Sequence, residues 1–433
     1  MVHWVLDAAA GVTPASVTVV VGHAAEDVVA SLPDGVHHAH QSERLGTGHA
    51  ALIGLREVAW EPGDTVLVVY GDTPMLSGAT LHALASRREA SGAAGVVLAA
   101  TAPDPGHYGR VIRHDDGTFA RIVEWKDASD DELAVDEVNS GMYAFEAAFL
   151  AEALPALGTA NAQGEYYLPD VCNAAAGRVV VESMPYEEMA GVNTHVELAA
   201  ADTARRGMIL RDHMLAGVRV DDPATTYVDA TVHLAPGVHL RPGTHLRGAT
   251  SVGAGSEVGP DTTIVDSTVG ERCHVWYAVV RGADIGAGVE VGPYASLRPG
   301  TVMGEGSKAG TFVETKNSVL GVGSKVPHLS YLGDATLGER VNIGAGTITC
   351  NYDGVDKHRT EIGDDVFIGS DTMLIAPVSI GSRAVTGAGS AIAKDVDEGA
   401  LAVERSDQRE IPGYGDRLAK KKAAKRKAKE EAG

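Results

Sequence analysis

The sequence predicts an α/β domain of Rossmann-like type followed by a parallel β-helix of hexapeptide repeats. Short β-branched runs alternate with helical stretches as far as about residue 193, which is typical of α/β folds. From Leu234 onward, aliphatic residues recur every six positions in glycine-rich surroundings, and a short fixed period of this kind indicates a solenoid. The length of 433 residues also exceeds what one hydrophobic core usually supports.

The α/β domain is expected over residues 1–193. Its β-branched runs lie at 17–21, 65–69 and 96–99, and their alternation with helical segments predicts a mostly parallel sheet. Residues 194–222 are expected to form a connecting helix and linker, because residues 194–216 contain no proline and a single glycine, Gly207.

The β-helix is expected over residues 223–402. Each hexad should form one flat side of a triangular prism, with its aliphatic residue pointing into a narrow core. The residues expected to point inward are Leu234, Leu240, Leu246, Val252, Val258, Ile264, Val279, Ile285, Val291, Leu297, Leu320, Val326, Leu332, Ile362, Ile368, Leu374 and Ile380. Residues 351–357 break the register and are polar, so we expect a loop that projects from the wall.

Composition and charge restrict the class of protein. Lys and Arg number 36 against 58 Asp and Glu, a formal charge of -22, which argues against nucleic-acid binding by the body of the protein. Three cysteines are too few for a disulfide framework. Neither a membrane-spanning apolar run nor a signal peptide is evident, so a cytoplasmic location without membrane partners is expected.

Residues 403–433 carry a basic tail rather than further repeats. Its cations are Lys420, Lys421, Lys422, Lys425, Arg426, Lys427 and Lys429. A solvated, mobile segment is the preferred interpretation, ahead of a nucleic-acid-binding arm.

Three histidines recur at the hexad spacing, His233, His239 and His245. Each precedes an inward leucine and lies on a different side of the prism. Metal ligands must converge, so we expect surface residues and no metal site here.

Four segments of the solenoid carry a specific resemblance: residues 297–300 (LRPG), 312–316 (FVETK), 328–334 (HLSYLGD) and 342–354 (NIGAGTITCNYDG). They closely resemble the acetyltransferase half of the family of bifunctional N-acetylglucosamine-1-phosphate uridyltransferases and glucosamine-1-phosphate acetyltransferases. The resemblance implies a left-handed β-helix and a homotrimer. It also implies acetyl transfer from acetyl-CoA to glucosamine-1-phosphate, and uridylyl transfer from UTP that yields UDP-N-acetylglucosamine for cell-wall precursors.

Acetyl transfer to an amine needs a base for the departing proton and a dipole for the oxyanion. The resemblance implies that His328 is this base and that Glu314 orients it. It assigns the sugar phosphate and sugar to Arg298, Lys316, Tyr331, Asn342, Asn351 and Tyr352. It assigns acetyl-CoA to Ala345, Asn351, Tyr352, Ser370, Ala388 and Arg405.

The α/β domain carries a second set of candidate residues. Residues 41–50 (QSERLGTGHA) form a Gly-rich turn, and residues 66–72 (VLVVYGD) end a buried strand at Asp72, where ligands bind in open α/β sheets. The resemblance makes Asp72 and Asn193 ligands of Mg²⁺, whose preferred ligands are oxygens. It assigns the sugar nucleotide to Gln41, Gly46, Thr47, Tyr70, Gly71, Asp72, Gly109, Glu124, Asn139 and Asn193.

The chain departs from the family at its beginning. Relatives open with a strand and a Gly-rich loop whose arginine and lysine hold the nucleotide phosphates, whereas residues 1–7 (MVHWVLD) resemble the helix that follows that loop. We therefore expect a Rossmann-like nucleotidyltransferase domain without its first, central strand, and doubtful uridyltransferase activity. A start site further upstream is the favoured explanation, and a real truncation is the alternative.

Other functional classes stay open at this point. The chain could be an acetyltransferase with a degenerate α/β domain, or a non-catalytic trimeric scaffold or sensor. A hexose-activating nucleotidyltransferase with a regulatory β-helix is less favoured, since it does not need Lys316, His328 and Asn351 together. A γ-type carbonic anhydrase is less favoured still, because it requires histidines that converge between adjacent subunits and the histidines of this sequence lack that pattern. Turnover of acetyl-CoA discriminates among these classes.

Overall fold

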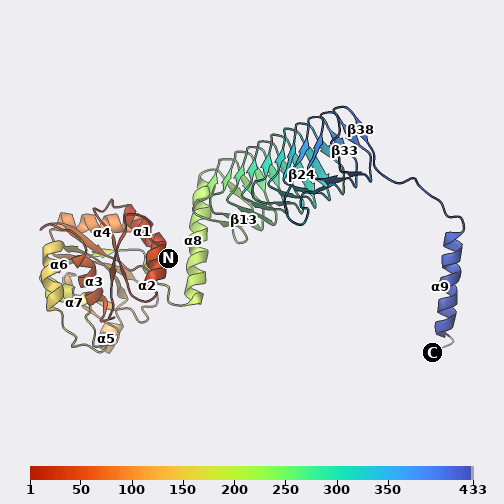
Figure 1. The fold of residues 1–433 in the computed structure, drawn as a ribbon. Helices are drawn as coiled ribbons and strands as arrows, with labels where there is room; N and C mark the ends of the chain where they lie inside the picture. The colour runs from red at the N-terminus through yellow and green to blue at the C-terminus, as the bar shows by residue number, and fades with distance from the viewer. Residues whose placement is uncertain (431–433) are drawn as a thin grey trace. The chain divides into compact units, whose positions relative to one another are not determined.

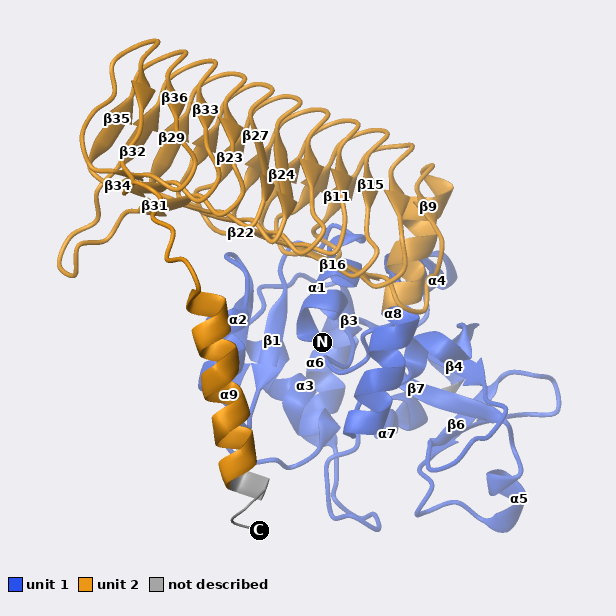
Figure 2. Cartoon of the chain, turned by 90° about the vertical axis from the view of Figure 1, so that its right-hand side faces the viewer, with its two compact units in different colours: residues 1–205 blue, residues 206–433 orange. Residues whose placement is uncertain are grey.

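The computed structural model describes residues 1–430 and divides into two compact units, residues 1–205 and residues from 206 onward (Figures 1 and 2). No helix among the described residues is long and apolar enough to cross a membrane. The helices are α1 (Val2–Ala10), α2 (Ala25–Ser31), α3 (Thr47–Arg56), α4 (Gly78–Ser91), α5 (Asp130–Leu133), α6 (Ala147–Ala153), α7 (Pro169–Ala174), α8 (His195–Leu215) and α9 (Tyr414–Glu430).

The main sheet of the first unit is mixed, which corrects the prediction of a mostly parallel sheet. Its strands are β3 (Thr65–Val68), β4 (Gly95–Thr101), β5 (Arg110–Arg113), β6 (Phe119–Val123), β7 (Glu137–Glu146) and β8 (Val179–Ser183). β4 and β8 run parallel, whereas β7 pairs antiparallel with β3, β4 and β5. Alternation of strands and helices predicts the class of fold but carries no direct signal for the direction of an inserted strand such as β7.

The sheet is interrupted beside β3. The strands β1 (Thr18–Val21) and β2 (His37–His40) form a separate parallel pair. Among the described residues, no strand pairing joins β1 to β3. One edge of β1 and one edge of β3 therefore have no strand partner in the part of the chain that the structure describes.

Helices cover both faces of the main sheet. Along β4, Val96 and Leu98 pack into a core cluster with residues of α1 and α4. Val97 and Ala99 point to the opposite face, into a cluster with residues of α6 and α7. This period of two is expected for a strand that is buried on both faces.

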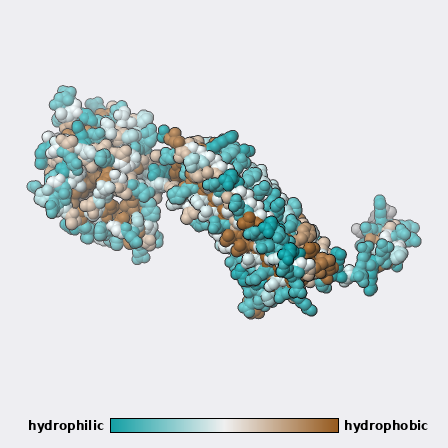
Figure 3. Space-filling view, turned by 90° about the horizontal axis from the view of Figure 1, so that it is seen from above, coloured by the Kyte–Doolittle hydropathy of each residue, from teal (hydrophilic) through white to brown (hydrophobic). Residues whose placement is uncertain are grey.

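The second unit begins within α8 and continues as a three-sided β-helix. Three parallel sheets of 10, 9 and 11 strands form its sides, and each strand pairs with the equivalent strand of the next coil. This parallel stacking fits the predicted left-handed hexapeptide solenoid, which runs from β9 (Arg219–Val220) to β38 (Leu401–Ala402). Figure 3 shows apolar patches interrupting its otherwise hydrophilic surface.

Sixteen of the seventeen predicted inward residues belong to, or pack against, the solenoid core. The exception is Val279, where the prediction is wrong. Val279 is half-buried, and its neighbour Val280 is fully buried in the core. The turns on either side of β19 (Val279–Arg281) are one residue shorter than a strict hexad requires, so the inward position moves from residue 279 to residue 280.

The structure also places the loop of residues 351–357, the three regularly spaced histidines and the basic tail. Residues 351–357 form the predicted loop between β31 (Ile348–Cys350) and β32 (Thr360–Ile362). His233, His239 and His245 lie on three different sheets, and no metal-binding cluster of His, Cys, Asp or Glu occurs among the described residues. The basic tail contains α9, whose described side chains are exposed.

Candidate functional site

His328 begins a column of small residues that runs along one corner of the solenoid. His328 ends β27 (Lys325–His328), and the register of this sheet passes from Lys325 to Asn342 in β30 (Asn342–Ile343). The same register places Ala345 one coil above His328. Continuing through β33 (Phe367–Ile368) and β36 (Val385–Thr386), it places Ser370 above Ala345 and Ala388 above Ser370.

Backbone hydrogen bonds between coils support this column. The amide of Asp371 donates to the carbonyl oxygen of Ala345 at 2.7 Å, and the amide of Gly389 donates to that of Ser370 at 2.8 Å. At the end of the column, Nη1 of Arg405 donates to the carbonyl oxygen of Ala388 at 2.9 Å. The structure therefore aligns His328 with four of the residues predicted to bind acetyl-CoA.

The adjoining sheet presents the predicted phosphate-binding cations. Arg298 follows β22 (Ser296–Leu297) and Lys316 ends β25 (Glu314–Lys316), and the register places them on neighbouring coils. Glu314 pairs in the same ladder with Tyr331 of β28 (Tyr331–Gly333). Two cations on one exposed face can hold a phosphate through charge-assisted hydrogen bonds.

Lys357 joins these cations, although the sequence analysis did not name it as a site residue. The Lys357 ammonium lies close enough to Lys316 to lower the pKa of that lysine. Lys357 comes from the loop of residues 351–357, 41 positions away from Lys316 in sequence. Its position beside the loop's Asn351 and Tyr352 was the one signal that could have suggested it.

Asn351 anchors this loop below the surface. Its Nδ2 donates to Oδ2 of Asp334 at 2.5 Å, and Nδ2 of Asn317 donates to Oδ1 of the same carboxylate at 2.6 Å. Burial opposes ionisation of Asp334, but these hydrogen bonds prevail and lower its pKa. Asp334 is therefore a buried anion that holds the base of the loop, while Tyr352 at the loop surface is 61% exposed.

Glu314 and Asn342 do not have the partners or the sheet position that their predicted roles imply. Glu314 was expected to orient His328, but its Oε1 accepts a hydrogen bond from Nη1 of Arg298 at 2.9 Å. No hydrogen bond joins Glu314 to His328 among the described residues. Asn342 lies on the sheet of His328 rather than on the sheet of the cations.

In the first unit, the Gly-rich turn packs against residues 165–168. Nε2 of Gln41 donates to the carbonyl oxygen of Gly46 at 3.3 Å. A Cβ at Gly46, whose φ is +109°, would lie 2.6 Å from the carbonyl oxygen of Tyr166, so only glycine fits there. Oγ1 of Thr47 accepts from the amide of Leu168 at 3.1 Å. The structure thus brings Gln41, Gly46 and Thr47 together.

A second group gathers where β5, β6 and β7 meet. The amide of Asn139 donates to the carbonyl oxygen of Gly109 at 2.8 Å. A Cβ on Gly109 would lie 3.2 Å from Oε1 of Glu124. Burial, followed by the charges of Asp127 and Asp170, raises the pKa of Glu124.

Tyr70 connects this group with Asp72. Its ring lies against Gly141, where a Cβ would come within van der Waals overlap of the ring. Burial of the hydroxyl, followed by the charges of Glu124 and Asp72, raises the pKa of Tyr70 to about 12. Tyr70, Gly71 and Asp72 lie just beyond the C-terminal end of β3, after Val69.

Asp72 and Asn193 converge around Gly191. A Cβ on Gly191 would lie 3.8 Å from Oδ2 of Asp72 and 4.0 Å from Nδ2 of Asn193. The amide of Val192 donates to the carbonyl oxygen of Asp72 at 3.1 Å and fixes the two segments side by side. A carboxylate and an amide that share this space fit a hard cation that retains several waters.

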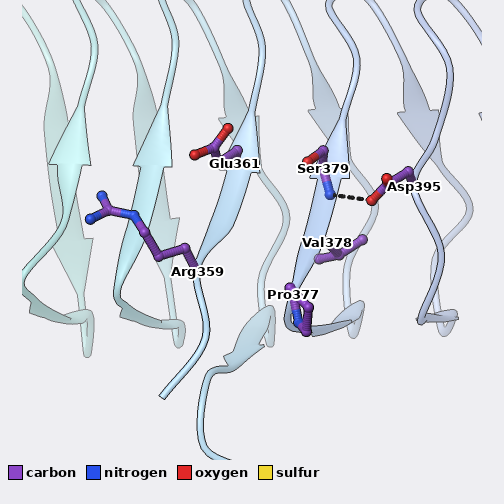
Figure 4. A pocket seen from close by; sticks show the side chains of 6 residues that line it. All are labelled: Arg359, Glu361, Pro377, Val378, Ser379 and Asp395. Carbon is purple, nitrogen blue, oxygen red and sulfur yellow. Dashed lines mark hydrogen bonds between the residues drawn. The ribbon is translucent and has the colours of Figure 1, made fainter. Parts of the chain in front are cut away.

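A shallow pocket lies elsewhere on the solenoid (Figure 4). Its lining residues come from or adjoin β32 and β35 (Val378–Ile380), and they are Arg359, Glu361, Pro377, Val378, Ser379 and Asp395. The amide of Ser379 donates to Oδ1 of Asp395 at 2.8 Å across it. None of the predicted site residues lines this pocket.

Known proteins match both units. The MobA-like NTP transferase domain matches residues 1–135, and the bacterial transferase hexapeptide (six repeats) matches residues 359–394. A solved acetyltransferase domain of PglB from Neisseria gonorrhoeae FA1090, in complex with acetyl coenzyme A, matches 28% of this chain and 57% of its own, with 24% identity and a TM-score of 0.25. That likeness is too low for a comparison of sites.

Curated relatives match nearly the whole chain. The bifunctional protein GlmU of Heliobacterium modesticaldum is 48% identical over 410 residues, which cover 94% of this chain and 89% of the relative. GlmU of Streptomyces avermitilis is 47% identical over 96% of this chain and 88% of its own length. The chain belongs to the bifunctional GlmU family, whose members acetylate glucosamine-1-phosphate and transfer uridylyl to N-acetylglucosamine-1-phosphate to produce UDP-N-acetylglucosamine.

Proposed function

We propose that the two activities are carried by separate sites, one in each unit, and that acetyl transfer takes place at the corner marked by His328. The observation that carries this proposal is the column of His328, Ala345, Ser370 and Ala388 beside the cations of the adjoining sheet. Small side chains along the column leave room for a slender pantetheine arm, and Arg405 at its end suits the phosphates of coenzyme A.

At this corner the acceptor amine would meet the thioester. Arg298, Lys316 and Lys357 would hold the sugar phosphate, and Tyr331, Asn351 and Tyr352 would line the sugar. His328 would accept the amine proton as nitrogen attacks the thioester carbon. Collapse of the tetrahedral intermediate breaks the carbon–sulfur bond, and the imidazolium returns its proton to the thiolate of coenzyme A. Glu314 stays a proposed supporting residue, acting through its pairing with Arg298.

The sheet position of Asn342 supports a homotrimer. Asn342 lies on a different side of the prism from Arg298 and Lys316, so one copy would present it to a sugar held by the cations of a neighbouring copy. The loop of residues 351–357 projects from the wall, and its Val355 is 83% exposed. It would reach the same neighbour.

The second site would lie in the first unit. Gln41, Gly46 and Thr47 would bind the uracil, and Gly109, Glu124 and Asn139 would bind the acetylated sugar, with Tyr70 and Gly71 between the two groups. Asp72 and Asn193 would hold Mg²⁺, which when bound offsets negative charge on the phosphates. A phosphate oxygen of N-acetylglucosamine-1-phosphate attacks the α-phosphorus of UTP, and pyrophosphate leaves.

The proposed uridyltransferase domain comprises residues 1–193, and the connector comprises residues 194–222. The proposed acetyltransferase domain comprises residues 223–402, and the basic tail comprises residues 403–433. The proposed location is the cytoplasm, with the small-molecule substrates as partners and no nucleic acid or membrane.

Two single substitutions, one in each unit, test the assignment of the two activities to separate sites. His328→Ala should reduce acetyl-CoA consumption with glucosamine-1-phosphate by 10²-fold or more, the usual contribution of a general base, and leave pyrophosphate release from UTP unchanged. Asp72→Ala should have the opposite pattern and raise the Mg²⁺ concentration needed for half-maximal rate. Retained acetyl transfer in His328→Ala, with wild-type oligomeric state, would disprove its role as the base.

A further inference from the structure

Four large apolar side chains stand in a row on the same corner of the solenoid as His328. We call this row the corner ridge: Tyr277, Tyr294, Phe312 and Leu329. The ring centroids of Tyr277 and Tyr294 are 5.5 Å apart, and those of Tyr294 and Phe312 are 5.3 Å apart. Phe312 is 57% exposed and Leu329 is 60% exposed. The ridge is therefore a stacked, outward-facing feature rather than part of the core.

The backbone of the ridge is unusual for such residues. All four have positive φ, with values from 45° at Leu329 to 59° at Tyr294. Elsewhere in the described solenoid, positive φ occurs only at glycine and at Asp, Asn or Arg. Large apolar residues are disfavoured in this conformation and gain nothing from solvent exposure. Within the described solenoid, only the corner ridge combines the backbone cost of positive φ with the exposure of large apolar side chains. This combination points to a role other than folding.

The ridge stops at the coil of His328. The equivalent corner positions of the next three coils are Gly346, Asp371 and Gly389, which again have positive φ. The amide of Gly346 donates to the carbonyl oxygen of Leu329 at 3.1 Å, so Leu329 lies directly below Gly346. Bulky residues therefore line the corner up to Leu329, and beyond it a glycine, an aspartate and a glycine accompany the small-residue column.

The corner therefore changes from large to small side chains between Leu329 and Gly346. We propose that Leu329, supported by Phe312 one coil below, forms the floor of the acyl site and restricts the donor to an acetyl group. The inference rests on the proposed function, in which the pantetheine arm follows Ala388, Ser370 and Ala345 toward His328. A thioester that arrives along this path meets Leu329 beside the base. An acyl chain longer than acetyl would have to extend into the space that Leu329 occupies.

The test compares acyl donors on the full chain. Leu329→Gly is the informative variant, because a φ of 45° suits glycine and the backbone is not strained by the change. We expect wild type to prefer acetyl-CoA over propionyl-CoA by 10- to 200-fold in kcat/KM, the usual range for one methylene. In Leu329→Gly this ratio should fall by at least about 10-fold, through faster use of propionyl-CoA.

Matched variants separate a local effect from a general one. Phe312→Ala should lower the ratio less, and Leu329→Met, which conserves volume, should retain it. Tyr277→Ala removes a ridge residue three coils away, about 14 Å at the usual strand spacing, and should leave the ratio unchanged. The melting temperature and oligomeric state of each variant serve as structural controls.

The outcomes are distinguishable. A wild-type enzyme that uses propionyl-CoA as well as acetyl-CoA would overturn the inference alone, as would a Leu329→Gly variant with the wild-type ratio. A wild-type chain that consumes neither donor in the presence of glucosamine-1-phosphate would overturn the proposed function together with the inference.

Discussion

In the proposed phosphate site of the solenoid, two lysines lie close enough to repel each other. Lys316 and Lys357 are close enough for the second to lower the pKa of the first, and Arg298 is already paired with Glu314. A cluster of like charges is unfavourable in the free protein and becomes favourable when a dianion binds between its members. This repulsion would be relieved by the proposed phosphate ligand.

Replacement of Lys357 by Gln should expose this role. We expect KM for glucosamine-1-phosphate to rise on the order of 10-fold, because one charge-assisted hydrogen bond to the phosphate is lost. The KM for acetyl-CoA should change little. Steady-state kinetics with each substrate varied in turn make the measurement. Lys394→Gln, a lysine outside the cation cluster, is the control, and equal KM values in wild type and Lys357→Gln would contradict the assignment.

Asp334 gives the loop of residues 351–357 a pH-dependent anchor. Hydrogen bonds from Asn317 and Asn351 lower its pKa below the usual value. A carboxyl with a depressed folded-state pKa stabilises the fold above its unfolded-state pKa, and the contribution is lost as pH falls through the folded-state value. This stabilisation is thus complete near neutral pH and disappears in acid.

Asn317→Ala removes one of these hydrogen bonds and makes the anchor testable. The variant should be less stable than wild type at pH 7, and the difference should narrow as pH falls below about 3.9, the ordinary pKa of an aspartate. Urea unfolding at a series of pH values measures it. A stability difference that is constant from pH 7 to pH 3 would show that Asp334 does not carry the effect.

At the scale of elements, the position of β19 in the solenoid wall can be checked by mutation. Val280 is fully buried and Val279 is half-buried. Val280→Ala should therefore destabilise the solenoid by about 2 kcal/mol, the combined cost of lost burial and a small cavity. Val279→Ala should cost less than about 1 kcal/mol. Denaturant midpoints of the two variants give the comparison, and the reverse order would restore the strict hexad register.

These elements also show what the sequence can and cannot specify. A residue pointing inward every six positions is a direct consequence of three equal sides, so nearly all core residues could be predicted. The corner column could not, because the loop of residues 351–357 places Ser370 25 positions after Ala345, whereas Ala345 follows His328 by 17. Only the pairing of strands shows that these residues are stacked. The antiparallel insertion of β7 likewise has no signature in local periodicity.

The candidate functional residues also differ in whether the sequence alone could identify them. Those inside continuous motifs, such as His328 and Tyr331, could be named from resemblance. Lys357 lies near Lys316 because the two ends of the projecting loop, Tyr352 and Lys357, pair at its base. The end of the corner ridge at Leu329 is visible only when the coils are aligned. Contacts between distant segments are the part of the site that required the structure.

At the scale of the whole molecule, the two units differ in how their strand edges are protected. In the solenoid, each inner coil is paired on all three sides with its neighbours, so an edge is left only at the ends of the stack. In the first unit, β1 and β2 are separated from the main sheet, and within the described part of the chain both β1 and β3 have an edge without a strand partner. Unpaired edges lower the local free energy of unfolding.

The units should therefore unfold separately, with the first unit melting at the lower temperature. Calorimetry of the 433-residue chain should resolve two transitions. Brief heating to a temperature between them should abolish pyrophosphate release from UTP while acetyl transfer to glucosamine-1-phosphate survives. Acetyl-CoA should raise only the upper transition, and UDP-N-acetylglucosamine with Mg²⁺ only the lower one, since each ligand stabilises the unit that binds it. A single transition shifted by both ligands would mean that the two units unfold as one cooperative structure, and that the division between β1 and β3 does not weaken the first unit.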